Sequence, residues 1–125
     1  MTEYLDLDDL LVAAEAALGD SAQARDIGLL QAAVTRPQAT VYGEDAYPTL
    51  DLKAAALIHS LVASHPLVDG NKRLGWVALR LFYRLNDADV RPDANDAFEL
   101  VVAIATGQLS DVSDIAARLA AWRSS

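Results

Sequence analysis

Apolar residues recur at helical spacing through most of this chain, and no stretch alternates apolar and polar residues as a half-buried strand does. Alanine and leucine dominate the apolar set, and both favour helices. Hydrophobic residues make up 53% of the 125 residues, which is enough for one packed core and too many for a disordered chain. We therefore expect an all-α fold and a single compact domain over residues 1–125.

Capping and helix-ending residues divide this pattern into about six helices. The first is capped by Asp6 and ended by Gly19, the third is capped by Asp51, and the sixth is capped by Ser110 or Asp111. The remaining bounds place helices over 26–35, 51–64, 71–85, 93–106 and from about 111 to 123. The stretch 71–85 is apolar on most sides, which is typical of a buried central helix. The stretch 38–49 is rich in turn residues and predicts a loop or a short hairpin.

The net charge of -8 argues against direct binding of nucleic acid, whose phosphates favour a basic face. Five of the ten Lys and Arg residues nevertheless fall within 72–91, and such a basic island can hold a small anion such as a nucleotide. For Arg80, Arg84 and Arg91 we expect only a solvated helix face. The absence of cysteine excludes disulfides, and no segment resembles a signal peptide or a membrane span. These features predict a cytoplasmic protein without membrane contact.

One short segment carries most of the chemistry, and its sequence is His65-Pro66-Leu67-Val68-Asp69-Gly70-Asn71-Lys72-Arg73. A helix ends at His65, because a residue before proline avoids the helical region. The amides of residues 70–73 then form the N-terminus of the next helix, where unpaired N–H groups bind anions. Lys72 and Arg73 add positive charge at the helix end where the dipole disfavours it. A bound phosphate would explain that placement.

Two further residues of the segment fit a phosphate-handling site. Asp69 can hold a magnesium ion through its carboxylate, and His65 is a candidate general base near neutral pH. Each residue alone also has an ordinary structural explanation, since Asp69 could cap a helix N-terminus and His65 could end a helix. The combination of base, carboxylate, glycine and two cations within nine residues favours a catalytic loop.

The segment resembles the signature of the Fic/Doc superfamily, His-Pro-Phe-x-Asp/Glu-Gly-Asn-x-Arg. It matches that signature at His65, Pro66, Asp69, Gly70, Asn71 and Arg73. The stretch 25–30 with Arg36-Pro37 is similar to the upstream helix of the family, and residues 105–107 resemble the tail of its Doc branch. The resemblance implies a Fic/Doc-type bundle of about six helices around a buried central helix.

Three departures from the signature indicate the branch. Leu67 replaces the usual Phe, a tolerable change for a residue that anchors the loop in the core. Lys72 and Trp76 stand where adenylylating Fic proteins typically have a glycine and a second arginine, and Trp76 itself is expected in the core. The sequence Asn-Lys-Arg is typical of the Doc (death-on-curing) branch, whose members are understood to transfer the γ-phosphate. The resemblance thus implies a protein Ser/Thr kinase.

The resemblance also assigns roles within the segment. His65 would take the proton from a target Ser or Thr hydroxyl, and Asp69 would bind Mg²⁺. The phosphates of ATP, or of another nucleoside triphosphate, would be held by Gly70, Asn71, Lys72 and Arg73. Arg73 would also neutralise charge on the transferring group, with Lys72 assisting, so that both count as catalytic.

The resemblance implies a toxin of a toxin–antitoxin pair that acts on a translation factor, with elongation factor Tu as the best-known target. Residues 38–49 correspond to the family's flap, which docks the target, although an ordinary surface loop is an equal alternative. An inhibitory motif is approached only at Thr40 and Glu44 and is broken at Asp45, so restraint is expected from a Phd-type antitoxin.

Two other functions remain open. One is a Fic-type nucleotidyl transferase (AMPylator) of a protein hydroxyl. The other is a catalytically silent Fic-fold binding module, against which the intact His65, Asp69, Asn71 and Arg73 argue.

Overall fold

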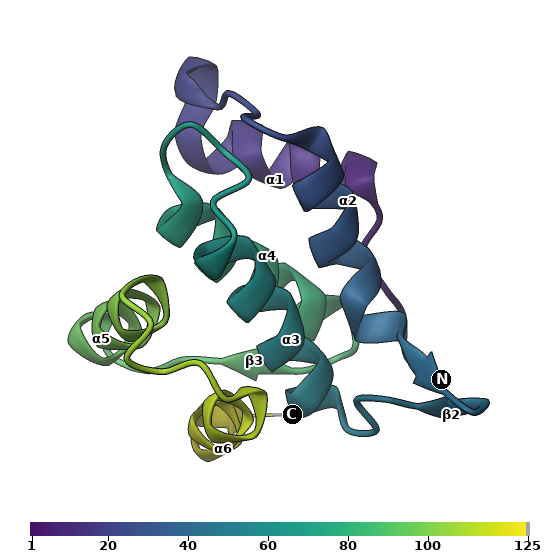
Figure 1. The fold of residues 1–125 in the computed structure, drawn as a ribbon. Coiled ribbons are helices and arrows are strands. Elements are labelled where there is room, and N and C mark those ends of the chain that lie inside the picture. The colour runs from purple at the N-terminus through teal and green to yellow at the C-terminus, as the bar shows by residue number, and fades with distance from the viewer. Residues whose placement is uncertain (125) are drawn as a thin grey trace.

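The computed structural model describes residues 1–124, with Ser21 described by its backbone only. Over this range the chain forms six α-helices, which confirms the expected all-α bundle (Figure 1). They are α1 (Leu7–Leu18), α2 (Ile27–Thr35), α3 (Leu50–Ala63), α4 (Asn71–Leu85), α5 (Ala94–Ala105) and α6 (Val112–Trp122). Two 3₁₀ turns follow the first two helices, η1 (Gly19–Ser21) and η2 (Arg36–Gln38). None of these helices is both long enough and apolar enough to cross a membrane.

Local side-chain caps set most of the helix starts. Asp6, Asp26, Asp93 and Asp111 each accept a hydrogen bond from a backbone N–H in the first turn of the helix that follows. The expectation for α3 was wrong by two residues, because Thr49 and not Asp51 is the cap.

The carboxylate of Asp51 has long-range partners instead. It accepts a hydrogen bond of 2.7 Å from the buried Tyr83 hydroxyl and pairs with Arg123 at 3.2 Å. Burial and the hydrogen bond with Asp51 raise the pKa of Tyr83. A residue held by such partners is not free to serve as a local cap.

The core is centred on the pair formed by α3 and α4. Helix α3 also packs against α2, α5 and α6, and its Ala54, Ala55 and Ala56 are fully buried. The expected central helix, α4, is buried along one side, but its Leu81 and Leu85 are 39% and 44% exposed. The more central position therefore belongs to α3, because its small side chains let neighbouring helices approach from several sides.

A glycine permits the close crossing of α3 and α4. A Cβ atom added at Gly75 would lie 2.5 Å from a methyl carbon of Val62. Any larger residue would force the two helices apart. This crossing places the start of α4, and the loop before it, against the rest of the bundle.

The sequence did not predict the small sheet near the C-terminus. β3 (Asp89–Val90) pairs antiparallel with β4 (Arg123–Ser124), with Asp89 opposite Ser124. Each strand has two residues, which is too short for an alternating pattern. The pairing ties the end of α6 to the segment between α4 and α5.

The expectation of a merely solvated basic face was also wrong. The guanidinium groups of Arg80, Arg84 and Arg91 all pair with the Asp89 carboxylate, at 2.8, 3.4 and 3.1 Å. The hydrogen bonds from Arg80, together with those from Arg91 and the Val90 amide, hold the pKa of Asp89 well below its ordinary value despite its burial. Arg80 and Arg84, both on α4, thus fix β3 to that helix.

Residues 40–45 form a hairpin that projects from the body of the molecule (Figure 1). In this hairpin β1 (Thr40–Val41) pairs with β2 (Glu44–Asp45). Tyr42 and Gly43 between them have φ angles of +53° and +81°, as a two-residue type I′ turn requires. Of the two expected possibilities, the hairpin is therefore confirmed.

Candidate functional site

Residues 65–73 form the connection between α3 and α4 and the first residues of α4. His65 follows Ser64, the C-cap of α3, and has a left-handed backbone with φ of +53°. Its side chain is exposed, whereas Leu67 is buried in the core. Leu67 thus anchors the loop as expected, and the loop presents His65 to solvent.

The side chain of Asn71 closes this loop from the inside. Its Oδ1 accepts a hydrogen bond of 2.8 Å from the Leu67 amide, and its Nδ2 donates one of 3.1 Å to the Leu67 carbonyl. Only 9% of Asn71 is exposed. The side chain therefore shapes the loop, and the group that Asn71 can offer to a phosphate is its backbone amide.

The start of α4 presents a set of backbone amides. The first intrahelical bond runs from the Leu74 amide to the Gly70 carbonyl at 2.9 Å. The amides of residues 71–73 precede it, so they have no acceptor within the helix. They point out of the N-terminus together with the positive end of the helix dipole. The sequence predicts an anion site at these amides.

Gly70 is required at the helix start for two reasons. Its φ of +87° lies in the left-handed region, and an added Cβ would come within 2.6 Å of the Leu18 side chain. A side chain at position 70 would therefore strain the backbone and push against Leu18.

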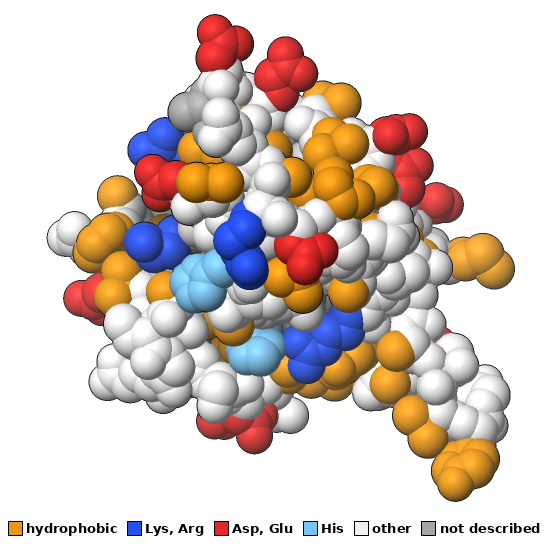
Figure 2. All heavy atoms as spheres, turned by 45° about the horizontal axis from the view of Figure 1, so that its top comes forward, with side chains coloured by type: hydrophobic (Ala, Val, Ile, Leu, Met, Phe, Trp, Pro, Cys, Tyr) orange, Lys and Arg blue, Asp and Glu red, His pale blue; other side chains and the backbone are white. Residues whose placement is uncertain are grey.

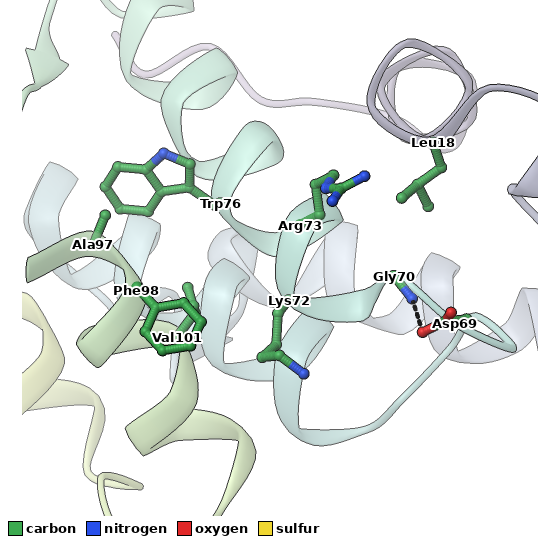
Figure 3. A pocket seen from close by; sticks show the side chains of 9 residues that line it. All are labelled: Leu18, Asp69, Gly70, Lys72, Arg73, Trp76, Ala97, Phe98 and Val101. Atoms are coloured by element: carbon green, nitrogen blue, oxygen red, sulfur yellow. Dashed lines mark hydrogen bonds between the residues drawn. The ribbon is translucent and has the colours of Figure 1, made fainter. Parts of the chain in front are cut away.

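A pocket of about 470 Å³ opens beside these amides. Figure 3 shows Asp69, Gly70 and the exposed Lys72 and Arg73 toward one end, with Trp76, Ala97 and Phe98 at the other. The pocket thus has a charged end at residues 69–73 and an apolar end between α4 and α5. Its size is in the range of cofactor and substrate sites.

The apolar end was not predicted from the sequence. Trp76 is only half-buried and lines the pocket, although it also packs against the core as expected. Phe98 is 63% exposed, and an exposed aromatic on an amphipathic helix is a signal that the sequence alone did not distinguish from a core residue. Both rings line the apolar end of the pocket.

His65 is not part of the lining of this pocket. Figure 2 shows both histidines of the chain on one face, next to Lys or Arg side chains. The structure therefore brings Asp69, Gly70, Lys72 and Arg73 to the pocket, with Asn71 beneath the loop and His65 at its beginning.

The predicted metal ligand offers one carboxylate. Asp69 is exposed, and its Oδ1 accepts a 2.8 Å hydrogen bond from the Gly70 amide. Within the described residues, no group of three or more acidic, histidine or cysteine side chains gathers to form a metal site. Asp69 therefore suits a magnesium ion that takes its other ligands from phosphate oxygens and water.

The base of the hairpin is fastened by two cations that sequence reasoning missed. Lys53, which is 1% exposed, donates a 3.0 Å hydrogen bond to Asp45 and another to the Tyr47 carbonyl. Arg36 donates to the Tyr47 hydroxyl at 2.9 Å and approaches His59 Nδ1 at 2.9 Å. The sequence did contain one indication of this support, because Lys53 directly precedes three alanines in the helix expected over 51–64.

The second histidine belongs to this hairpin support rather than to the pocket. Burial, followed by the nearby positive charge of Arg36, lowers the pKa of His59. A neutral His59 can accept a hydrogen bond from Arg36, which suits a structural role.

Comparison with known proteins gives two findings. Residues 3–83 match the model of the Fic/DOC family. The chain is also 50% identical over 124 residues to Toxin Doc of Mycolicibacterium smegmatis, an alignment that covers 98% of this chain and 95% of that protein. The family match includes the whole of the loop and α4 up to Tyr83.

Proposed function

The chain belongs to the Fic/DOC family, and we propose that it is the toxin of a toxin–antitoxin pair that acts as a protein Ser/Thr kinase. Members of this family transfer a phosphate or a nucleotide onto proteins, so the chain is a transferase by family. The observation that carries the kinase proposal is the pocket, whose charged end combines unpaired amides with Lys72 and Arg73. We infer ATP as the phosphate donor and a single domain over residues 1–125.

The pocket accommodates a nucleotide in one direction. The triphosphate lies at the α4 N-terminus, where the amides of residues 71–73 and the side chain of Arg73 neutralise its charge. Gly70 lets the phosphates approach the backbone. The base extends toward Trp76 and Phe98, which flank it at the apolar end.

The reaction is then an in-line displacement at the γ-phosphorus. The target hydroxyl oxygen forms a bond to the γ-phosphorus, its proton passes to the His65 imidazole, and the bond to the β,γ-bridging oxygen breaks to release ADP. Arg73 stabilises charge on the transferring group, and Lys72 contributes a point charge. A magnesium ion at Asp69 would neutralise charge on the phosphates.

The direction of transfer follows from two residues. Trp76 occupies the position at which a second arginine would hold the far phosphates for attack at the α-phosphorus, and Lys72 replaces a glycine. The neutral Trp76 ring offers no bidentate contact to phosphate. These two side chains favour γ-transfer over nucleotidyl transfer.

The test uses ATP labelled separately at the α and γ positions, with magnesium and a bacterial lysate as the source of target. We expect a protein to gain label only from γ-labelled ATP. Label from the α position would establish the nucleotidyl transferase instead. Absence of transfer from either donor, with folded protein, would favour the silent binding module.

We further propose elongation factor Tu as the target and the cytoplasm as the site of action. The exposed edges of β1 and β2 offer strand-like backbone contacts to an extended target segment. Purified elongation factor Tu should gain one phosphate in the same assay. A different labelled band in the lysate would reject this target and leave the kinase proposal standing.

A further inference from the structure

Arg25, just before α2, is bound to the backbone around His65 by three of its donors. Its Nη2 donates to the Ser64 carbonyl at 3.0 Å, its Nε donates to the His65 carbonyl at 2.7 Å, and its amide donates to the Pro66 carbonyl at 2.8 Å. Three consecutive carbonyls thus accept hydrogen bonds from one residue.

The carbonyls of Ser64 and His65 lack hydrogen-bond donors within α3, and the Arg25 guanidinium group supplies them. Ser64 and His65 follow the end of α3, where carbonyls have no donor within the helix and the helix dipole favours a cation. The planar guanidinium group presents two N–H donors in a fixed fork, which matches two adjacent carbonyls. A lysine would offer a single ammonium group in place of that fork.

The backbone of His65 is held in an uncommon conformation. A φ of +53° is rare for a residue with a side chain, and surrounding contacts must maintain it. The segment around Arg25 also runs alongside the loop, with the Asp26 amide donating to the Pro66 carbonyl at 3.0 Å and the Val68 amide donating to the Gln23 carbonyl at 2.9 Å. Among these hydrogen bonds, the one that reaches His65 itself comes from the Arg25 Nε, and its neighbour on the guanidinium group goes to Ser64.

We propose that Arg25 is a positioning residue that holds His65 in its left-handed conformation and thereby directs the imidazole relative to the anion site of α4. Arg25 does not line the pocket and acts through His65. The inference rests on the proposed role of His65 as general base. The claim that Arg25 holds the backbone conformation of His65 can be tested without any measurement of activity.

The structural test is NMR of Arg25→Gln. A positive φ brings the amide and α protons of one residue close together, so wild-type His65 should give a strong intraresidue NOE between them. In Arg25→Gln we expect that NOE to weaken and the Val68 amide to exchange at least tenfold faster. The spectrum of the remaining helices should stay unchanged, because Arg25 is exposed.

The kinetic test measures phosphoryl transfer by Arg25→Gln and by two further variants, Arg25→Lys and Arg25→Ala. We expect kcat to fall at least tenfold in Arg25→Gln, with less than a twofold change in KM for ATP. The kcat of Arg25→Lys should lie between those of the wild type and Arg25→Gln. Guanidinium ion added to Arg25→Ala should restore part of kcat. The matched control is Arg118→Gln, since Arg118 is exposed on α6 and makes no hydrogen bond or ion pair with the described residues.

The possible outcomes are separable. A wild-type NOE in Arg25→Gln overturns the proposal, and so does loss of the NOE with unchanged kcat. If Arg25→Gln does not fold, Arg25→Lys decides by the same two measurements. Wild-type protein without transfer activity would reject the proposed function, while the NOE would still show whether Arg25 holds His65.

Discussion

Within residues 65–73 some side chains are exposed at the surface and others are buried and hold the loop in place. His65, Asp69, Lys72 and Arg73 are exposed, whereas Leu67 and Asn71 point inward. The sequence identified these positions because residue type and spacing are local. It did not reveal that both polar groups of the Asn71 side chain bond to Leu67, since spacing alone does not give side-chain direction.

Replacement of His65 should stop catalysis and leave the fold intact. We expect His65→Ala and His65→Asn to lose about 10²–10⁴-fold in transfer rate, because a general base typically contributes that much. Asn tolerates the left-handed backbone, so it separates loss of the base from strain at this position. Label transfer and urea unfolding of both variants provide the check. Full activity in either folded variant would remove His65 from its role.

The two cations of α4 should differ in importance. Arg73→Ala should be severe, because a guanidinium group binds phosphate with two parallel donors. Lys72→Ala should be milder, since lysine supplies a point charge. Initial rates at saturating ATP measure the difference. A larger loss from Lys72→Ala than from Arg73→Ala would contradict the assignment.

At the scale of elements, the boundaries that the sequence predicted well are those set by neighbouring residues. Asp6, Asp93 and Asp111 cap helices within three residues of themselves. The features that it missed depend on distant partners, as in the pairing of β3 with β4 and the hydrogen bond from Tyr83 to Asp51. No local pattern encodes contacts between residues more than thirty positions apart.

The arginine cluster predicts a stability change with a defined pH dependence. Asp89→Asn should lose about 2 kcal/mol at pH 7, because it removes the charge of a buried carboxylate that three arginine side chains share, two of them largely exposed. Since folding lowers the pKa of Asp89, its contribution is fully present above the unfolded value of about 4 and declines as pH falls below it. The difference in free energy of unfolding between the wild type and Asp89→Asn should therefore be smaller at pH 3 than at pH 7.

Urea unfolding at pH 7 and pH 3 measures that gap. The matched control is Asp87→Asn, at an exposed position whose left-handed backbone suits Asn, and it should change stability by less than about 0.5 kcal/mol. A pH-independent gap for Asp89→Asn would mean that its charge is not the source of the stability.

The hairpin should loosen when its buried anchor is removed. Lys53→Met keeps the length of the side chain but loses the donors to Asp45 and the Tyr47 carbonyl. We expect the Ala46 amide, which bonds to the Ala39 carbonyl at 2.8 Å, to exchange at least tenfold faster while the helices stay protected. Lys72→Met, an exposed lysine, is the control. Unchanged exchange at Ala46 would show that the turn alone holds the hairpin.

At the scale of the whole molecule, charge and topology act together. The chain carries a net charge of -8, yet α4 begins with two cations at the pocket. The fold brings that helix start beside α5, which no sequence pattern predicted, and so creates the apolar end of the pocket. The motif gave the charged half of the site, whereas the other half required tertiary structure.

If the protein is the proposed kinase, its activity must be restrained in the cell that makes it. The segment that comes nearest to an inhibitory motif, Thr40 to Asp45, forms the projecting hairpin and not a helix over the pocket. Restraint should therefore come from a second chain, a Phd-type antitoxin that folds into a helix on binding. Expression alone should arrest growth of a host that has the target and lacks the antitoxin. His65→Ala should relieve the arrest, and co-expression of the small neighbouring gene product should do so by direct binding, measured by calorimetry. Harmless overexpression of folded wild-type protein would count against the toxin and favour the silent binding module.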